Sequence, residues 1–98
     1  MSLVEVALRT GVTVADLESL IRGNAPVGIA ERLGIPLLNL EEFLWRGYAG
    51  AKLAHRMGMS MAAAEDLARA MGPEGRIGII VGLLLSSNQA RAAEAGGG

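Results

Sequence analysis

Three segments of the sequence share one spacing of alanine, glycine and apolar residues, and this repetition constrains the fold more than any other feature. In each segment an arginine stands two places after an alanine, and a glycine stands four places after the same alanine. The alanines are Ala7, Ala30 and Ala54, which lie 23 and 24 residues apart. A period in this range predicts a tandem repeat of one supersecondary unit.

Apolar residues complete the pattern directly before the alanine, directly after the glycine, and ten and thirteen places after the alanine. The central copy consists of Ile29, Ala30, Gly34, Ile35, Leu40 and Phe43. The upstream copy consists of Val6, Ala7, Gly11, Val12, Leu17 and Leu20. The downstream copy consists of Leu53, Ala54, Gly58, Met59, Ala64 and Leu67. This pattern resembles the helix-turn-helix unit of the Cro/Xre repressor family. A small alanine lets two helices approach, and a glycine adopts positive φ where the first helix ends.

The predicted fold class is all-α, with six to seven short helices. Three tandem helix-turn-helix-like units, at about 3–23, 26–47 and 49–72, precede a longer apolar C-terminal helix at 73–95. We expect residues 1–95 to form a single domain and residues 96–98 to form a flexible tail. The chain has 98 residues and no cysteine, so its core is expected to form without disulfide bonds.

Polar residues before the apolar stretches predict where several helices begin. Thr13, Asn24 and Ser60 are the expected N-caps of the second, third and sixth helices. The fifth helix is expected at about Ala49–Met57, and the sixth is expected to end at Gly72-Pro73.

The C-terminal helix contains an apolar run, Ile77–Leu85, that is too short to span a membrane. A buried strand is the less favoured alternative for this run. Gly78, Gly82 and Ser86 recur every four residues, and such a stripe of small residues lets another helix approach closely. The sequence therefore predicts self-association, while packing as the central helix of its own domain is the competing interpretation. The expected self-association residues are Gly78, Ile79, Gly82, Leu83, Leu85 and Ser86.

In the family that the pattern resembles, the second helix of the unit enters the DNA major groove. Here the early positions of the three second helices hold no Arg, Lys, Gln or Asn, the usual base-reading residues. Five of the six later positions are acidic, and they define a predicted docking face for a basic partner: Glu18, Glu41, Glu42, Glu65 and Asp66. The alternative is that these carboxylates solvate an outer face and complement the helix dipoles. The best candidates for residual DNA contacts are Arg22, Asn39 and Arg46.

Charge and composition narrow the function further. The net charge is −1, whereas nucleic-acid-binding domains usually carry a basic excess. The chain has a single histidine, His55, and no cysteine, so we expect no catalytic site, no metal site and no cofactor. We therefore expect a non-catalytic protein-interaction module, not an enzyme, that forms a homo-oligomer through its C-terminal helix and docks a protein partner. The alternative is a DNA-binding regulator of the Cro/Xre type. The first residues, MSLVEVALR, resemble no signal peptide, so we expect a cytoplasmic protein without membrane contact.

Overall fold

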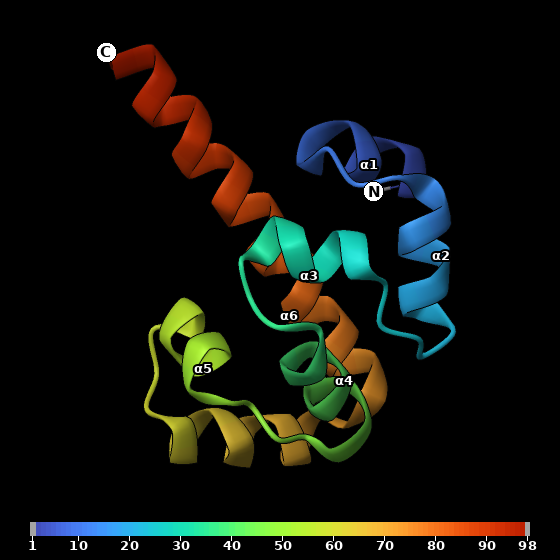
Figure 1. Ribbon diagram of the computed structural model, residues 1–98, viewed down its shortest axis with the longest axis vertical. Coiled ribbons are helices and arrows are strands. Elements are labelled where there is room, and N and C mark those ends of the chain that lie inside the picture. Colours follow the sequence, from blue (N-terminus) through green and yellow to red (C-terminus); the bar gives the residue numbers. More distant parts are fainter. Residues whose placement is uncertain (1, 98) are drawn as a thin grey trace.

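The computed structural model describes the backbone of residues 2–97 and the side-chain surroundings of residues 2–86. It confirms the all-α prediction, and no strand occurs in the described range. Its six helices are shown in Figure 1: α1 (Leu3–Thr10), α2 (Val14–Ile21), α3 (Val27–Leu33), α4 (Leu37–Arg46), α5 (Ala51–Met57) and α6 (Met61–Gly97). Residue 98 of the predicted tail lies outside the described residues.

Hydroxyl side chains cap the start of three helices. The Thr13 hydroxyl accepts a hydrogen bond from the Asp16 N–H at 3.1 Å at the start of α2. Before α6, the Ser60 hydroxyl accepts a hydrogen bond from the Ala63 N–H at 3.2 Å. Before α1, the Ser2 hydroxyl accepts one from the Glu5 N–H. Each cap satisfies a first-turn N–H that has no partner within the helix. The predictions for Thr13 and Ser60 are therefore confirmed.

The third helix begins later than predicted. Asn24 does not cap it, because it lies in the turn that ends α2, where its N–H donates to the Ser19 carbonyl at 2.9 Å. Pro26, in extended conformation, is the N-cap of α3 and supplies no side-chain hydrogen bond. The fifth helix also starts two residues late, at Ala51, because Gly50 adopts the non-helical angles φ 49° and ψ 151°.

Glycines in the left-handed region end α1, α3 and α5. Gly11, Gly34 and Gly58 have φ values of 75°, 70° and 70°. In each case the glycine N–H donates to the carbonyl of the alanine four residues earlier: Ala7, Ala30 or Ala54. The recurring alanine–glycine spacing thus corresponds to one recurring main-chain hydrogen bond at a helix end.

Helix α6 bends sharply at Gly72, where φ is 74° and ψ is −178°. The predicted stop at Gly72-Pro73 is therefore a bend between two arms, residues 61–71 and 73–97. Pro73 is suited to the first position of the second arm, because its missing N–H would have no helical partner there. The predicted strand alternative for Ile77–Leu85 is wrong, since this run is helical.

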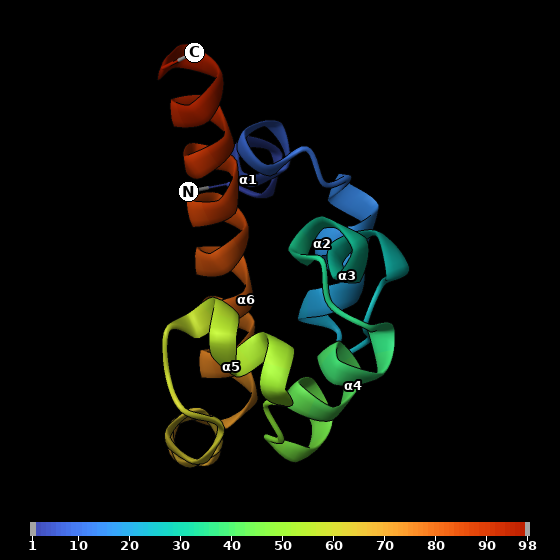
Figure 2. The same ribbon diagram turned by 60° about the vertical axis from the view of Figure 1, so that its left-hand side comes forward.

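The second arm of α6 organises the packing. Each of the other five helices contacts α6, and Figure 2 shows α1 to α4 along one side of its long arm. The buried core is mainly aliphatic, with Phe43 as an aromatic member, and draws on every helix. Its largest fully buried apolar side chains are Phe43, Leu17, Leu20, Ile29, Leu33, Leu40, Leu53, Ile80 and Leu84. The radius of gyration, 13.0 Å, equals the value of about 13 Å expected for a compact chain of roughly this length.

Candidate interaction surfaces

The second arm of α6 has two different faces. Ile80 and Leu84 are fully buried in the core, whereas Gly78, Gly82 and Ser86 are exposed. A Cβ atom added at Gly78 or at Gly82 would meet no atom of the chain within 4 Å. The small-residue stripe therefore faces away from the helices that cover α6.

The remaining residues predicted for self-association flank this stripe. Ile79, Leu83 and Leu85 are half-buried, and the first two pack against the core. The arm is thus central core on one face and uncovered by the described residues on the other. Of the six predicted residues, the exposed three are the small ones.

The acids predicted as a docking face lie on three helices, and several pair with the chain's own arginines. On α2, Glu18 and Arg22 form an exposed ion pair at 3.6 Å, and the Arg22 Nε also donates to the Glu18 carbonyl at 3.4 Å. Exposed pairs one helical turn apart contribute only about 0.3–0.5 kcal/mol. The Arg22 guanidinium nevertheless offsets much of the local charge of the Glu18 carboxylate.

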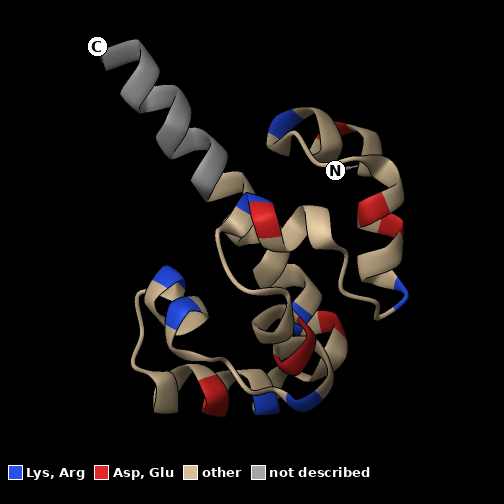
Figure 3. Cartoon of the chain, in the orientation of Figure 1, with Lys and Arg blue, Asp and Glu red and all other residues tan. Residues whose placement is uncertain are grey.

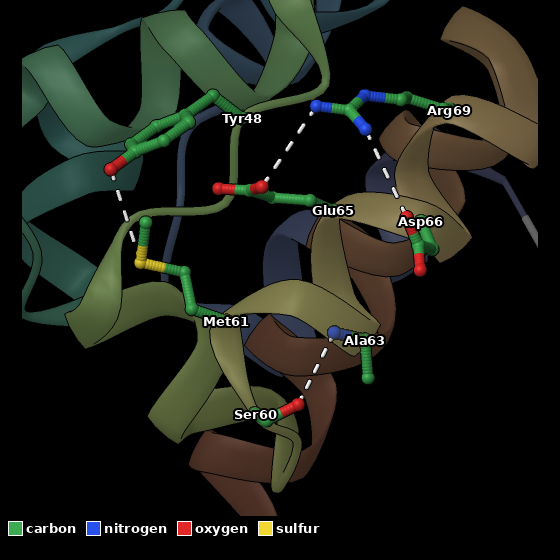
Figure 4. Close-up of polar contacts among 7 residues, drawn as sticks. All are labelled: Tyr48, Ser60, Met61, Ala63, Glu65, Asp66 and Arg69. Atoms are coloured by element: carbon green, nitrogen blue, oxygen red, sulfur yellow. Dashed lines mark hydrogen bonds and ion pairs between the residues drawn. The ribbon is translucent and has the colours of Figure 1, made fainter.

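On α6, Arg69 lies between two carboxylates. Its Nη2 is 3.9 Å from Glu65 and its Nη1 is 3.8 Å from Asp66 (Figure 4). The Glu65 side chain is only 16% exposed, and its Oε1 is buried without a hydrogen-bond partner. The same close-up shows the Tyr48 hydroxyl beside the Met61 sulfur, at 3.9 Å.

The acids of α4 are half-buried. Glu42 lines a hollow of about 420 Å³ together with Arg46, Tyr48 and Arg69, so cationic side chains surround it. Glu41, its neighbour in sequence, is also half-buried. Four of the five predicted acids, all but Glu41, therefore lie close to arginines, so they do not form a uniformly negative surface.

The three candidate DNA contacts lie at different places. Arg22 is the C-cap of α2 and pairs with Glu18, while Arg46 lines the hollow that Glu42 shares. Asn39, near the start of α4, is half-buried beside Gly50, where an added Cβ would lie 3.0 Å from the Asn39 amide nitrogen. No described hollow is lined by two of these three residues.

Sequence reasoning missed a basic hollow beside α5. Lys52, His55 and Arg56 line it together with Ala51 and Gly34, around a volume of about 640 Å³. Their spacing of three and four residues puts them on one face of the helix, and all three are exposed. That spacing is a signal in the sequence, but the opposite wall, Gly34 at the end of α3, depends on the fold. Figure 3 shows the two blue segments on α5.

No described group of three or more His, Asp or Glu side chains is arranged to hold a metal ion. Across the described residues, no helix combines the length and the apolar character that crossing a membrane requires. Comparison with known proteins finds no match, whether to a protein family, a curated protein or a solved structure.

Proposed function

We propose that this chain is a non-catalytic protein-interaction module that self-associates through the second arm of α6. The observation that supports the proposal is the open space around Gly78 and Gly82. A glycine inside a helix costs roughly 0.5–1 kcal/mol relative to alanine. No packing within the chain requires these two glycines, because an alanine would fit at either position. Close approach of a second helix backbone is the use that such residues serve.

The flanking residues suit the same role. Ile79, Leu83 and Leu85 are half-buried, so part of each side chain is left at the border of the glycine stripe. A second copy packed on this stripe would cover that apolar area and remove it from water. Symmetric pairing of one patch with itself is the commonest arrangement of soluble oligomers.

The helices are proposed to pair as three tandem helix-turn-helix-like units: α1 with α2, α3 with α4, and α5 with the first arm of α6. The equivalent glycine ends of α1, α3 and α5 support this arrangement. So does the placement of two equivalent arginines. Arg32 lies against the Gly11 turn and Arg56 against the Gly34 turn, each reaching the first helix of the preceding unit.

Partner docking through Glu18, Glu41, Glu42, Glu65 and Asp66 remains part of the proposal. DNA binding of the Cro/Xre type is the alternative that the tandem units favour. Carboxylates near the start of each second helix would repel phosphates, and the net charge of −1 opposes a strong non-specific attraction. Protein interaction is therefore the better supported function.

The test compares two substitutions at Gly82. Gly82→Leu should lower the solution mass measured by light scattering, because the side chain blocks approach of a second helix. Gly82→Ala should fold at least as stably as the parent chain, since its methyl group meets no atom. Ala70→Leu places the same leucine side chain at an exposed position on the other arm and serves as the control.

A parent chain that is monomeric at every concentration would refute self-association. If Gly82→Leu and Ala70→Leu lower the solution mass equally, the assignment of self-association to this face of α6 would be refuted. The same measurement with mixed duplex DNA at low salt tests the alternative. A rise in mass that disappears when salt is added would favour DNA binding.

A further inference from the structure

The basic hollow beside α5 holds cationic side chains that no carboxylate of the described residues pairs with. No ion pair or hydrogen bond of the described residues engages the Lys52, His55 or Arg56 side chains with a carboxylate. By contrast, Glu18, Glu65 and Asp66 each lie within ion-pair distance of an arginine. The hollow is therefore locally positive, although the chain as a whole is slightly negative.

The shape of the hollow follows from two small residues. Ala51 and Gly34 line it between the cationic side chains. A Cβ at Gly34 would lie 2.7 Å from the Arg56 Nη2, so the missing side chain is what leaves room for the guanidinium along this wall. Arg56 is thereby held at the end of α3, while Lys52 and His55 are exposed along the same face of α5.

We propose that this hollow binds an acidic segment of a protein partner, with carboxylates placed against Lys52 and Arg56. The inference rests on the proposed protein-interaction function, to which it adds a second docking site, for an acidic segment, apart from the acidic face. Guanidinium and ammonium groups both bind carboxylates, and the planar guanidinium can do so with two parallel hydrogen bonds.

A protein segment fits the site better than a nucleic acid does. The basic side chains of the hollow come from one seven-residue helix, whereas nucleic-acid binders typically neutralise many phosphates along an extended basic surface. Two or three carboxylates on one turn of a helix match the spacing of Lys52, His55 and Arg56. The rest of the chain, with ten acidic residues, would repel a long polyanion.

The binding experiment uses a fluorescently labelled helical peptide with glutamates four residues apart on an alanine background. Fluorescence anisotropy measures its affinity for the full chain, and a peptide with glutamine at those positions measures the charge-independent part. We expect the double variant Lys52→Gln/Arg56→Gln to weaken binding of the glutamate peptide by about tenfold. Arg22→Gln/Arg46→Gln makes the same change of net charge away from the hollow and should alter the affinity less than twofold.

A second variant acts by adding charge. Ala51→Glu places a carboxylate in the hollow itself, in the first turn of α5, where an acid is favourable for the helix dipole. It should compete with the peptide and weaken binding to a similar extent while the circular dichroism spectrum stays that of the parent.

Three results would overturn the proposal: equal binding of the glutamate and glutamine peptides, equal loss in the two double variants, or tighter binding of a short duplex DNA that is abolished by Lys52→Gln/Arg56→Gln. The last result would reassign the hollow to nucleic acid. The solution mass of Lys52→Gln/Arg56→Gln should equal that of the parent, so a failure of this inference remains distinct from a failure of self-association through α6.

Discussion

The guanidinium of Arg76 donates a hydrogen bond from Nη1 to the main-chain carbonyl of Ala68, at 3.1 Å, across the bend in α6. Arg76 is only 9% exposed, and its Nε is buried without a hydrogen-bond partner. The guanidinium also approaches Gly47 at the end of α4, where an added Cβ would lie 3.3 Å from Nη1. One side chain thus connects the two arms of α6 and reaches the end of α4.

This relationship predicts different outcomes for two substitutions of Arg76. Arg76→Ala should lower the free energy of unfolding by about 2–4 kcal/mol, because it leaves a cavity and an unpaired Ala68 carbonyl. Arg76→Met should cost less, since the thioether chain fills most of the volume and no buried charge is left unpartnered. Urea unfolding followed by circular dichroism measures both. Equal losses in the two variants would contradict a packing role for the arginine stem.

Gly75 and Gly78 should respond in opposite ways to alanine. A Cβ at Gly75 would lie 2.5 Å from the Met71 Cβ, which is fixed to the backbone just before the bend. Gly75→Ala should therefore destabilise by about 1–3 kcal/mol, as overpacking does. Gly78→Ala meets open space and should stabilise by up to about 1 kcal/mol through helix propensity. Thermal unfolding of the two variants at equal concentration tests the sign of each change in stability. If both variants are stabilised, or both are destabilised, the predicted contrast is refuted.

The turn glycines allow a double-mutant cycle. Gly34 and Gly58 both have φ 70°, so alanine at either position should cost about 1–2 kcal/mol of backbone strain. Gly34→Ala should cost about 0.3–1 kcal/mol more, because it displaces the Arg56 guanidinium from the C-terminal end of α3. In an Arg56→Ala background this excess should vanish. If the excess persists without the guanidinium, Arg56 is not its cause.

Trp45 joins α4 to the segment that follows α2. Its indole N–H donates to the Gly23 carbonyl, although the side chain is 59% exposed. Trp45→Phe removes the donor but keeps an aromatic ring, and should cost about 1 kcal/mol. Circular dichroism must follow this unfolding, because Trp45 is the chain's only tryptophan. Leu38→Ala, which shortens another exposed side chain of α4, is the control and should cost less than 0.5 kcal/mol.

The helix ends were the most predictable part of this fold. Only glycine adopts positive φ without strain, so Gly11, Gly34 and Gly58 stop their helices irrespective of what packs around them. Thr13 and Ser60 are equally local, since each cap spans three residues. Asn24 failed as a predicted cap because the turn that ends α2 extends to it and α3 begins only after Pro26, an arrangement that residue type alone does not reveal.

Tertiary arrangement accounts for what the sequence did not predict. The spacing of Gly78, Gly82 and Ser86 identified a small-residue stripe, but whether the helices of the chain would cover it depended on which side of α6 they occupy. The basic hollow was missed for a similar reason. The spacing of Lys52, His55 and Arg56 is visible in the sequence, but the contribution of Gly34 requires α3 and α5 to be brought together.

The pairing of α1 with α6 also affects when the fold can be completed during synthesis. Leu3–Thr10 is synthesised before its packing partner, the arm of α6 that begins beyond the bend at Gly72. At typical translation rates, roughly 4–15 s separate the appearance of the two. Until then the apolar face of α1, including Val6, has no finished surface to cover it. During synthesis, α1 therefore depends on a helix made much later to protect its apolar face from premature contacts.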